Sequence, residues 1–309
     1  MTELSVIIPS YRAPDLLKQA LVSLGQEAGD PGLAEIIVVD DGSPDFEAGA
    51  CDGLTGQWPL KVLHLDQNRG RAIARNTGLR AAQGRVVVFL DGDMSVCPGF
   101  LAAHALFHRQ QTRAIAVGGI CFAPSIRVNA MTRYIHSRGV ARFGAGEVPY
   151  KCFVTGNSSV PREALVETGG FDEAFVTYGG EDLELGYRLH QLGLRVHYLP
   201  QARSLHHQVR PFADMGQAMA AYGRDSVPIL LSRHPELDSL LHLDFLRQSR
   251  WNPRRWLLGL ALFRPVQLLV GALVLGLLPW RLPAILFDYL WWSHRTRGYL
   301  GRDTRHPMP

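Results

Sequence analysis

The chain has 309 residues, of which 47% are hydrophobic and 19% are charged, and its formal net charge is +4. That length can form one large α/β domain with an appendage. The basic residues are not gathered into a patch interleaved with aromatic residues, so no nucleic-acid partner is expected. The four cysteines are too widely spaced for a metal-binding pair or a disulfide framework, which favours reduced thiols in a cytoplasmic chain.

Strands and helices alternate from the beginning of the chain, a pattern typical of a mostly parallel sheet. The apolar run at residues 4–8 predicts the first strand, and no signal peptide is expected there. A helix is predicted from Pro14, because proline suits a first helical turn and apolar residues follow at helical spacing. Later strands are predicted at 36–39, 61–65, 86–90 and 114–121, helices at 69–82, 99–110 and 181–192, an irregular loop region at 122–150 and an extended segment at 151–160.

Two carboxylates, Asp91 and Asp93, directly follow the apolar run at residues 86–90. Such a run predicts a buried parallel strand, and open α/β sheets bind ligands at the carboxyl ends of their strands. Two acidic groups placed there can hold a hard divalent cation, which in turn can hold a diphosphate. The alternative is a solvated turn, because the pattern Asp-x-Asp is common on protein surfaces.

Two earlier strands end in polar residues that should reach the same edge of the sheet, namely Ser10-Tyr11 and Asp40-Asp41. An aromatic ring can stack on a nucleobase, a carboxylate can accept a hydrogen bond from a base N–H, and a metal can bridge phosphates. The three strand ends together therefore suggest a nucleoside diphosphate site. A plain turn remains the alternative for Asp40-Asp41-Gly42-Ser43, since these are common turn residues.

A second acidic pair, Glu181-Asp182, follows Gly179-Gly180 and opens a predicted helix. The glycines would let the backbone approach a ligand closely. One interpretation is helix capping, because acidic residues in a first turn favour the helix dipole. The other is catalysis, in which this pair deprotonates an incoming nucleophile while the first pair holds the metal of the leaving group.

These motifs together resemble glycosyltransferase family 2, an inverting family with the Rossmann-like GT-A fold. The resemblance spans residues 4–210, about two thirds of the chain. It rests on five segments in the family's order and spacing, which are residues 5–11, 37–43, 68–78, 88–93 and 179–182. The resemblance implies an α/β fold with a mostly parallel central sheet, and a glycosyltransferase activity.

The family's roles can be carried over to matching positions. The nucleobase would be held by Tyr11 and Asp41, with Pro9 shaping the loop beneath it. The donor side would be lined by Asn68, Gly70, Arg75 and Asn76, and Asp91 would face the ribose or sugar, next to the metal. Asp93 would bind Mn²⁺ or Mg²⁺ on the diphosphate. Asp182 would be the general base, and Glu181 would either support it or contact the acceptor. A downstream histidine would complete the metal site, and His207 is favoured over His206 because a glutamine follows it.

The resemblance implies a nucleotide-sugar donor, with UDP as the expected nucleotide, and a glycan or lipid-linked acceptor. Processive members carry Gln-x-x-Arg-Trp, whereas residues 248–251 read Gln-Ser-Arg-Trp, one residue short, which favours addition of a single sugar. One alternative is a sugar nucleotidyltransferase, but no glycine-rich basic loop follows the first strand. Another is a non-catalytic scaffold protein, against which both acidic motifs argue. A Rossmann dehydrogenase is a weaker alternative, because the G-x-G-x-x-G motif that it would need does not follow the first strand.

The composition changes abruptly after about residue 250. We predict a catalytic domain at residues 1–235, a basic linker at 236–255, an apolar helical segment at 256–292 and a basic tail at 293–309. The apolar segment has arginines on both sides, so a membrane hairpin or re-entrant pair broken at Pro279–Pro283 is expected, with Trp256, Trp280, Trp291 and Trp292 at the interface. Attachment to the inner face of the cell membrane would follow. A soluble helical subdomain or a dimer interface is the alternative.

Overall fold

The computed structural model describes residues 3–30, 33–247 and 252–301, and it divides into two compact units. The first unit comprises Met1–Ile126, Arg138–Val176 and Glu181–Val209, and the second comprises Arg127–Ser137, Thr177–Gly180 and Arg210–Pro309. The domain boundaries predicted at residues 235, 255 and 292 stay predictions. The Gln-Ser-Arg-Trp segment at 248–251 lies outside the described residues.

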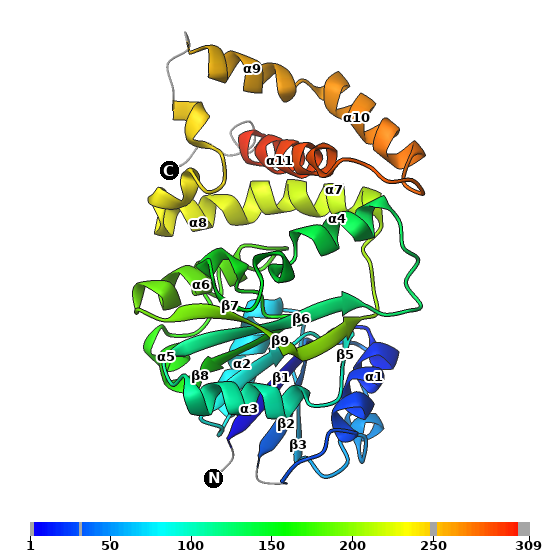
Figure 1. Cartoon of the computed structure of the whole chain (residues 1–309), viewed down its shortest axis with the longest axis vertical. Coiled ribbons are helices and arrows are strands. Elements are labelled where there is room, and N and C mark those ends of the chain that lie inside the picture. Colours follow the sequence, from blue (N-terminus) through cyan, green and yellow to red (C-terminus); the bar gives the residue numbers. More distant parts are fainter. Residues whose placement is uncertain (1–2, 31–32, 248–251, 302–309) are drawn as a thin grey trace. The chain divides into compact units, whose positions relative to one another are not determined.

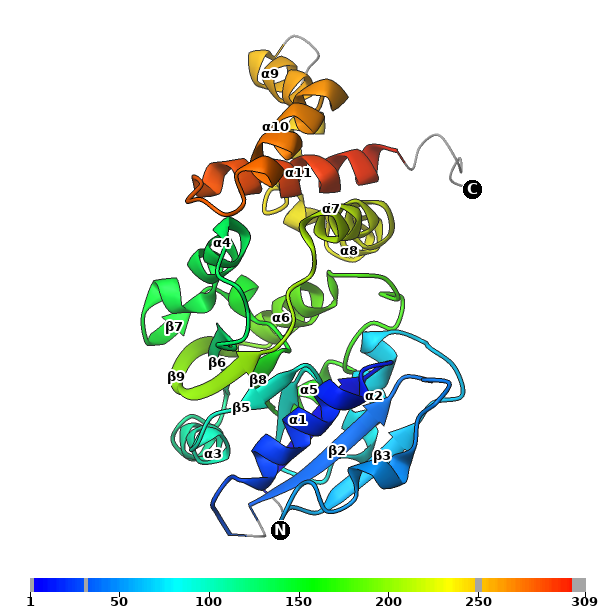
Figure 2. The same ribbon diagram turned by 90° about the vertical axis from the view of Figure 1, so that its right-hand side faces the viewer.

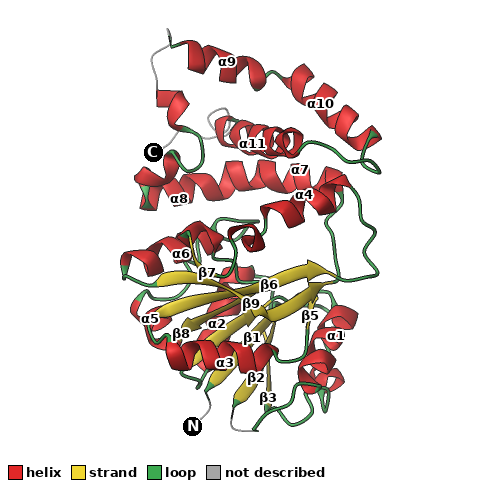
Figure 3. Cartoon of the chain, in the orientation of Figure 1, coloured by secondary structure: helices red, strands yellow, loops and turns green. Residues whose placement is uncertain are grey.

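The first unit is built on a central sheet (Figures 1 and 3). Its strands are β1 (Leu4–Ser10), β2 (Ala34–Asp40), β3 (Leu60–His64), β4 (Val86–Leu90), β5 (Met94–Val96), β6 (Ala114–Phe122), β7 (Gly146–Val148), β8 (Asn157–Pro161) and β9 (Arg195–His206). Their order is β3-β2-β1-β4-β8-β6-β9-β5, with β7 paired to β9. The strands β3, β2, β1 and β4 are mutually parallel, and β8 runs antiparallel between β4 and β6.

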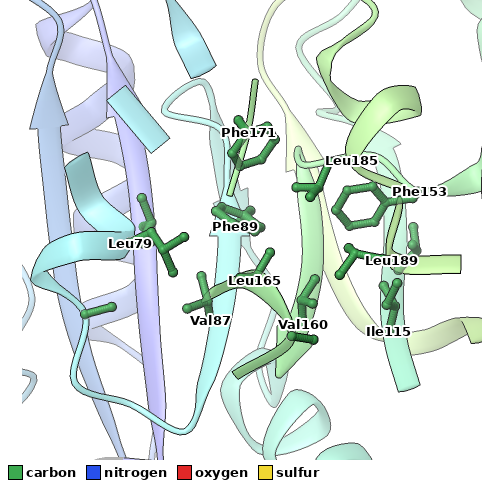
Figure 4. Close-up of a cluster of buried hydrophobic side chains, with 14 of the residues drawn as sticks. Leu79, Val87, Phe89, Ile115, Phe153, Val160, Leu165, Phe171, Leu185 and Leu189 are labelled. Carbon is green, nitrogen blue, oxygen red and sulfur yellow. The ribbon is translucent and has the colours of Figure 1, made fainter. Parts of the chain in front are cut away.

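Helices cover both faces of this sheet. They are α1 (Pro14–Gly25), α2 (Arg71–Ala81), α3 (Phe100–Gln110), α5 (Arg162–Glu167) and α6 (Glu181–Gln191). One face packs with α2, α5 and α6 around Val87, Phe89 and Leu185 (Figure 4), and the other packs with α1 and α3. Both faces of β4 are buried, which explains why its sequence is a continuous apolar run. The α/β fold predicted from the sequence is confirmed.

The predicted strands and helices of the first unit are present with small shifts at their ends, but two predictions were wrong. Residues 122–150, predicted as an irregular loop region, contain the helix α4 (Ala130–Arg138) and the strand β7. Residues 151–160, predicted as extended, begin in a 3₁₀ turn at Tyr150–Cys152, and only β8 is a strand. All four cysteines are free thiols in the structure, and Cys51 is the buried one among them.

The second unit is helical. It contains most of α4, then α7 (Phe212–Ala221), α8 (Val227–Arg233), α9 (Pro253–Ala261), α10 (Arg264–Gly276) and α11 (Ala284–Leu300). A π-helical turn at Tyr222–Ser226 joins α7 to α8. Figure 2 shows α11 beside α7, and the contact is close because Gly223 and Gly298 each face backbone atoms of the opposite helix.

The apolar segment is helical and breaks before α11, where Pro279 and Pro283 lie, as predicted. Trp291 and Trp292, expected at a membrane interface, are half-buried, with their rings against Phe212 and Phe245, and their interfacial position stays a prediction. In the ranges 3–30, 33–247 and 252–301, no helix combines the length and the apolar character needed to cross a membrane.

Two buried histidines of α3, His104 and His108, form a polar network with β8. Each has a ring nitrogen 2.8 Å from the Ser159 hydroxyl, and His104 Nε2 lies 3.2 Å from Asn157 Oδ1. Since an amide oxygen can only accept, His104 Nε2 donates and its Nδ1 accepts from Ser159, which fits a neutral ring. Burial lowers the pKa of His104 to about 4 and that of His108 to about 3.

We expect this network to make the protein sensitive to acid. As the pH falls below about 6.5, the histidines take up protons in the unfolded chain but stay neutral in the folded one, so the unfolded state gains stability. Between pH 7 and pH 5 the free energy of unfolding should fall by on the order of 2 kcal/mol for each histidine. Urea denaturation at both pH values measures the loss.

The control is the double variant His104→Gln and His108→Gln. It should be less stable than the wild type at pH 7, because part of the network is lost, but its stability should change less between pH 7 and pH 5. Equal pH dependence in the two proteins would contradict the assignment of neutral buried rings.

Candidate functional site

The carboxyl ends of β1, β2 and β4 lie at one edge of the sheet. Since these strands are parallel neighbours, the residues that follow them come together, as the sequence predicted. Ser10 is in register with Asp40, and the Asp41 N–H donates to the Ser10 carbonyl at 2.8 Å. Asp91 follows β4 on the other side of β1.

The two acids that follow β2 hold different loops. Asp40 is buried and accepts hydrogen bonds of 2.7 Å from the Ser43 N–H and hydroxyl, and it pairs with His64 Nδ1 at 2.9 Å. Asp41 accepts from the backbone N–H groups of Arg69 and Gly70, both at 2.8 Å. The Asp41 carboxylate, which is predicted to contact a nucleobase, therefore already fixes the loop at residues 69–70.

Tyr11 and its loop offer a surface for a base. The Tyr11 ring is 39% exposed, with the Arg12 guanidinium 5.2 Å from its centroid, and it directly follows β1, which contains Pro9. Asn68 is exposed beside the loop that Asp41 holds. Gly70 has a φ of +92° and lies against the Val176 carbonyl, so this position requires glycine.

The centre of the site is the buried side chain of Arg75 on α2. Its Nη2 lies 2.9 Å from Asp91 Oδ1, and its Nη1 lies 3.3 Å from Glu181 Oε1 and 3.7 Å from Asp182 Oδ1. The guanidinium carbon is 5.6 Å from the centroid of the Phe171 ring. Arg75 was predicted to line the donor side, but the structure places it beneath three carboxylates as their common counter-ion.

The Arg75 guanidinium affects the pKa values of Asp91 and Asp182 to different extents. Burial would raise the pKa of Asp91, but Arg75 outweighs that effect and holds it below its usual value. Burial, followed by the neighbouring Glu181 charge, raises the pKa of Asp182 to about 6, against the opposing effects of Arg75 and Thr155. The Thr155 hydroxyl donates to Asp182 Oδ1 at 2.8 Å and its N–H to Oδ2 at 3.2 Å.

Asn76 has a different place from the one predicted. Its amide donates to the Phe171 carbonyl at 2.9 Å and to Glu173 Oε1 at 3.0 Å, and its oxygen accepts from the Phe171 N–H at 2.9 Å. The side chain is buried, and these contacts fix the loop that follows α5. In the structure Asn76 therefore supports the ring beneath Arg75 instead of lining the donor side.

The histidine that meets Asp93 is His206 and not His207. His206 Nε2 lies 2.9 Å from Asp93 Oδ2, whereas His207 Nε2 lies 2.7 Å from the Ser95 hydroxyl. Neighbouring residues at the end of a strand point to opposite sides, and the antiparallel register of β5 and β9 pairs Met94 with His206. We therefore revise the predicted ligand from His207 to His206.

Asp93 and His206 fit a divalent cation in part. Asp93 Oδ1 is buried and has no hydrogen-bond partner among the described residues. Burial would lower the pKa of His206, but its hydrogen bond to Asp93 and the charges of Asp93 and Asp91 raise it. Within the described ranges, no three His, Cys, Asp or Glu side chains converge into a complete cage, so a bound cation would need oxygens from another molecule.

Sequence reasoning missed Thr155 and Phe171. Thr155 orients Asp182, and Phe171 lies under Arg75, yet neither belongs to a motif that stands out in the chain. Gly179 and Gly180 before α6 have φ values of +82° and +101°, which favour glycine, while the close approach to a ligand predicted for them stays a prediction.

The sequence is similar to those of known glycosyltransferases. Residues 5–169 match the family described as glycosyl transferase family 2, and residues 139–210 match one described as the N-terminal domain of galactosyltransferase. The pre-mycofactocin glycosyltransferase of Mycobacterium tuberculosis (strain ATCC 25618 / H37Rv) is 32% identical over 247 residues, which cover 76% of this chain and 48% of that protein. The chain spans about half to two thirds of the length of the curated relatives it matches.

The fold is similar to solved structures as well. The mannosyltransferase PcManGT from Pyrobaculum calidifontis, in complex with GDP-Man and Mn²⁺, has a TM-score of 0.60 at 19% identity, over 97% of this chain and 88% of that chain. S. aureus TarS 1–349, in complex with UDP-GlcNAc, has a TM-score of 0.55 at 18% identity, over 98% and 90%. This likeness confirms the predicted GT-A fold.

We expect Arg75 to be essential for folding the site. In Arg75→Met, three carboxylates lose their buried counter-ion, and the free energy of unfolding should fall by about 3–5 kcal/mol. Urea denaturation measures the loss. Arg80→Met is a matched control on the same helix, because Arg80 makes an exposed ion pair with Glu173 at 3.7 Å. The control should lose less than about 1 kcal/mol, and similar losses in both variants would contradict the role of Arg75.

Proposed function

Because the chain belongs to glycosyl transferase family 2, we propose that it transfers a single sugar from a UDP-linked donor to an acceptor hydroxyl, with inversion at the anomeric carbon. The acceptor would be a glycan or a lipid-linked sugar in cell-surface polysaccharide or glycolipid assembly. The observation that carries the proposal is the Asp182 carboxylate. Its pKa is raised to about 6, and the Arg75 guanidinium that it contacts also contacts Asp91.

Asp182 has the properties of a general base. Its side chain is 27% exposed, so an acceptor can reach it. Its raised pKa brings it close to neutral pH, where a base is both deprotonated and able to take up a proton. The two hydrogen bonds from Thr155 fix the orientation of the carboxylate while leaving lone pairs on both oxygens.

The proposed reaction is a single displacement. The acceptor hydroxyl gives its proton to Asp182 while its oxygen forms a bond to the anomeric carbon. The bond between that carbon and the diphosphate oxygen breaks, and UDP leaves with the electron pair. Attack from the face opposite the leaving group inverts the anomeric centre. Asp91, which Arg75 keeps ionised, would accept hydrogen bonds from the donor's sugar or ribose.

Asp93 and His206 would hold Mn²⁺ or Mg²⁺. The buried, unpartnered Asp93 Oδ1 supports this assignment, and because the Asp93 and His206 side chains are 27% and 30% exposed, diphosphate oxygens could serve as further ligands. When bound, the cation supplies positive charge to the leaving diphosphate. Asp91 serves the metal less well than the sequence suggested, because Arg75 binds its Oδ1.

UDP is the nucleotide we propose, and the loops after β1 and β2 would bind it. The exposed Tyr11 ring can stack on a base, and the lone pairs of Asp41 that remain can accept from a base N–H. TarS binds UDP-GlcNAc and PcManGT binds GDP-Man on the same fold, so both nucleotides belong in a binding panel. Release of UDP from one sugar donor, and none from GDP-mannose, is the expected result.

We expect Asp182→Asn to bind the donor and to lose transfer. The amide preserves the shape of the side chain but cannot take up the acceptor's proton, so kcat should fall by about 10²–10⁴-fold. Donor affinity, measured by titration calorimetry, should change little. Glu163→Gln, which alters an exposed carboxylate in the first turn of α5, is the control and should behave as the wild type.

The pH profile gives an independent check on the base. Because protonation disables Asp182, kcat/KM should decrease as the pH falls through about 6. Unchanged turnover by Asp182→Asn would refute the assignment of this base. Failure of the wild type to bind any nucleotide sugar, with or without metal, would favour the non-catalytic scaffold.

We expect the metal to depend on His206 and not on His207. His206→Gln and Asp93→Asn should each weaken Mn²⁺ binding by about tenfold or more, since each removes one of the two protein ligands. His207→Gln is the matched control, because its ring bonds to Ser95 and should not touch the ion. Calorimetric titration with Mn²⁺ measures the affinities, and a larger effect at His207 would restore the original assignment.

A further inference from the structure

The second unit exposes an unusually large apolar surface on α9, α10, the turn that leads into α11 and the first turn of α11. We call it the α9–α10 face. Its large side chains are between 38% and 72% exposed, and they are Trp256, Leu257, Leu260, Phe263, Leu268, Leu269, Leu273, Leu275, Leu277, Trp280 and Ile285. Soluble proteins rarely expose so many contiguous large apolar side chains unless another molecule covers them.

The way α10 packs explains why these side chains point outward. The buried side of α10 contains Gln267 and Val274, and Gly271 lies against Leu290 of α11. The Gln267 amide donates to the Ser293 hydroxyl at 3.0 Å inside this contact. The opposite side of α10 therefore carries leucines that none of the described residues of the second unit covers.

The shape of this surface fits an interfacial helix. One side of α10 packs on protein and the other is open along its 13 residues, about 20 Å at roughly 1.5 Å per residue. Helices that lie in the plane of a membrane surface present one apolar side to the acyl chains in this way. Trp256 and Trp280, which are 71% and 68% exposed, are residues that favour the boundary between lipid and water.

The charges around the face favour an anionic lipid surface over a second copy of the chain. Residues 253–287 contain four arginines and no acidic residue. Arg264 and Arg281 are exposed, and Arg133 Nη1 donates to the Trp280 carbonyl at 3.4 Å. A two-fold dimer through this face would bring its arginines together without acids to balance them. Anionic headgroups would attract the same arginines.

We infer that the α9–α10 face binds the surface of a membrane containing anionic lipid, with its leucines among the acyl chains and its arginines on the headgroups. This inference does not rest on the reaction proposed above, because no residue of the face belongs to the site around Arg75. In place of the membrane hairpin expected from the sequence, we infer that the α9–α10 face lies on the membrane surface without crossing it. The cytoplasmic location predicted from the sequence stays a prediction.

Flotation of the full chain with lipid vesicles tests the inference. The wild type should bind vesicles of phosphatidylcholine and phosphatidylglycerol, and it should bind phosphatidylcholine alone more weakly. Leu269→Glu with Leu273→Glu should reduce binding by about tenfold or more, because two anchoring side chains become charged. Arg264→Gln with Arg281→Gln should reduce the preference for phosphatidylglycerol, by roughly fivefold per arginine.

The matched control is Leu106→Glu with Val166→Glu, which alters side chains of similar exposure in the first unit and should leave binding unchanged. Circular dichroism would establish that every variant is folded. Failure of the wild type to bind either vesicle, or equal binding by the leucine variant, would overturn the inference. So would a wild-type dimer in sedimentation velocity that the leucine variant dissociates, because a second copy would then cover the face.

Discussion

The site depends on one buried cation, the guanidinium of Arg75. It touches carboxylates from two separate segments of the chain, Asp91 after β4 and Glu181 with Asp182 at the start of α6. Without it, three acids in a poorly solvated space would repel one another and take up protons. The planar fork of an arginine can serve both segments with different nitrogens, which the single ammonium of a lysine cannot do. The Phe171 ring packs against the Arg75 guanidinium, and Asn76 hydrogen-bonds to the Phe171 backbone.

Asp91 and Asp182 have the same side chain but different pKa values, because they lie at different distances from the Arg75 guanidinium and have different neighbours. Asp91 lies 2.9 Å from the guanidinium and has a lowered pKa, whereas Asp182 lies 3.7 Å away beside Glu181 and has a raised one. An acid in the first turn of a helix is usually explained by capping. Asp182 instead accepts hydrogen bonds from Thr155, which lies on another segment, and its pKa is raised, whereas the dipole at a helix N-terminus would lower it. Capping therefore does not account for this residue, and its role as a general base stays the proposal to be tested.

The sequence predicted much of what depends on neighbours along the chain, although it missed the helix α4. The apolar run before Asp91 placed both acids of the metal motif at a strand end, and the glycines before α6 indicated a special backbone. Features that depend on distant pairing were missed. The choice of His206 over His207 follows from the pairing of β5 with β9, and the burial of Arg75 follows from the meeting of α2 with α6. No local pattern carries this information.

The same distinction applies to the apolar segment, where composition predicts helices but not which side each helix exposes. Four tryptophans looked equivalent in the sequence, yet Trp291 and Trp292 are half-buried against Phe212 and Phe245, while Trp256 and Trp280 are exposed. Among so many leucines, apolar contact alone would tolerate several rotations of α10. The amide of Gln267 limits them, because a buried amide that lost Ser293 would cost about 1–3 kcal/mol. This polar contact thus acts with the packing of Val274 and Gly271 to orient the leucines of α10.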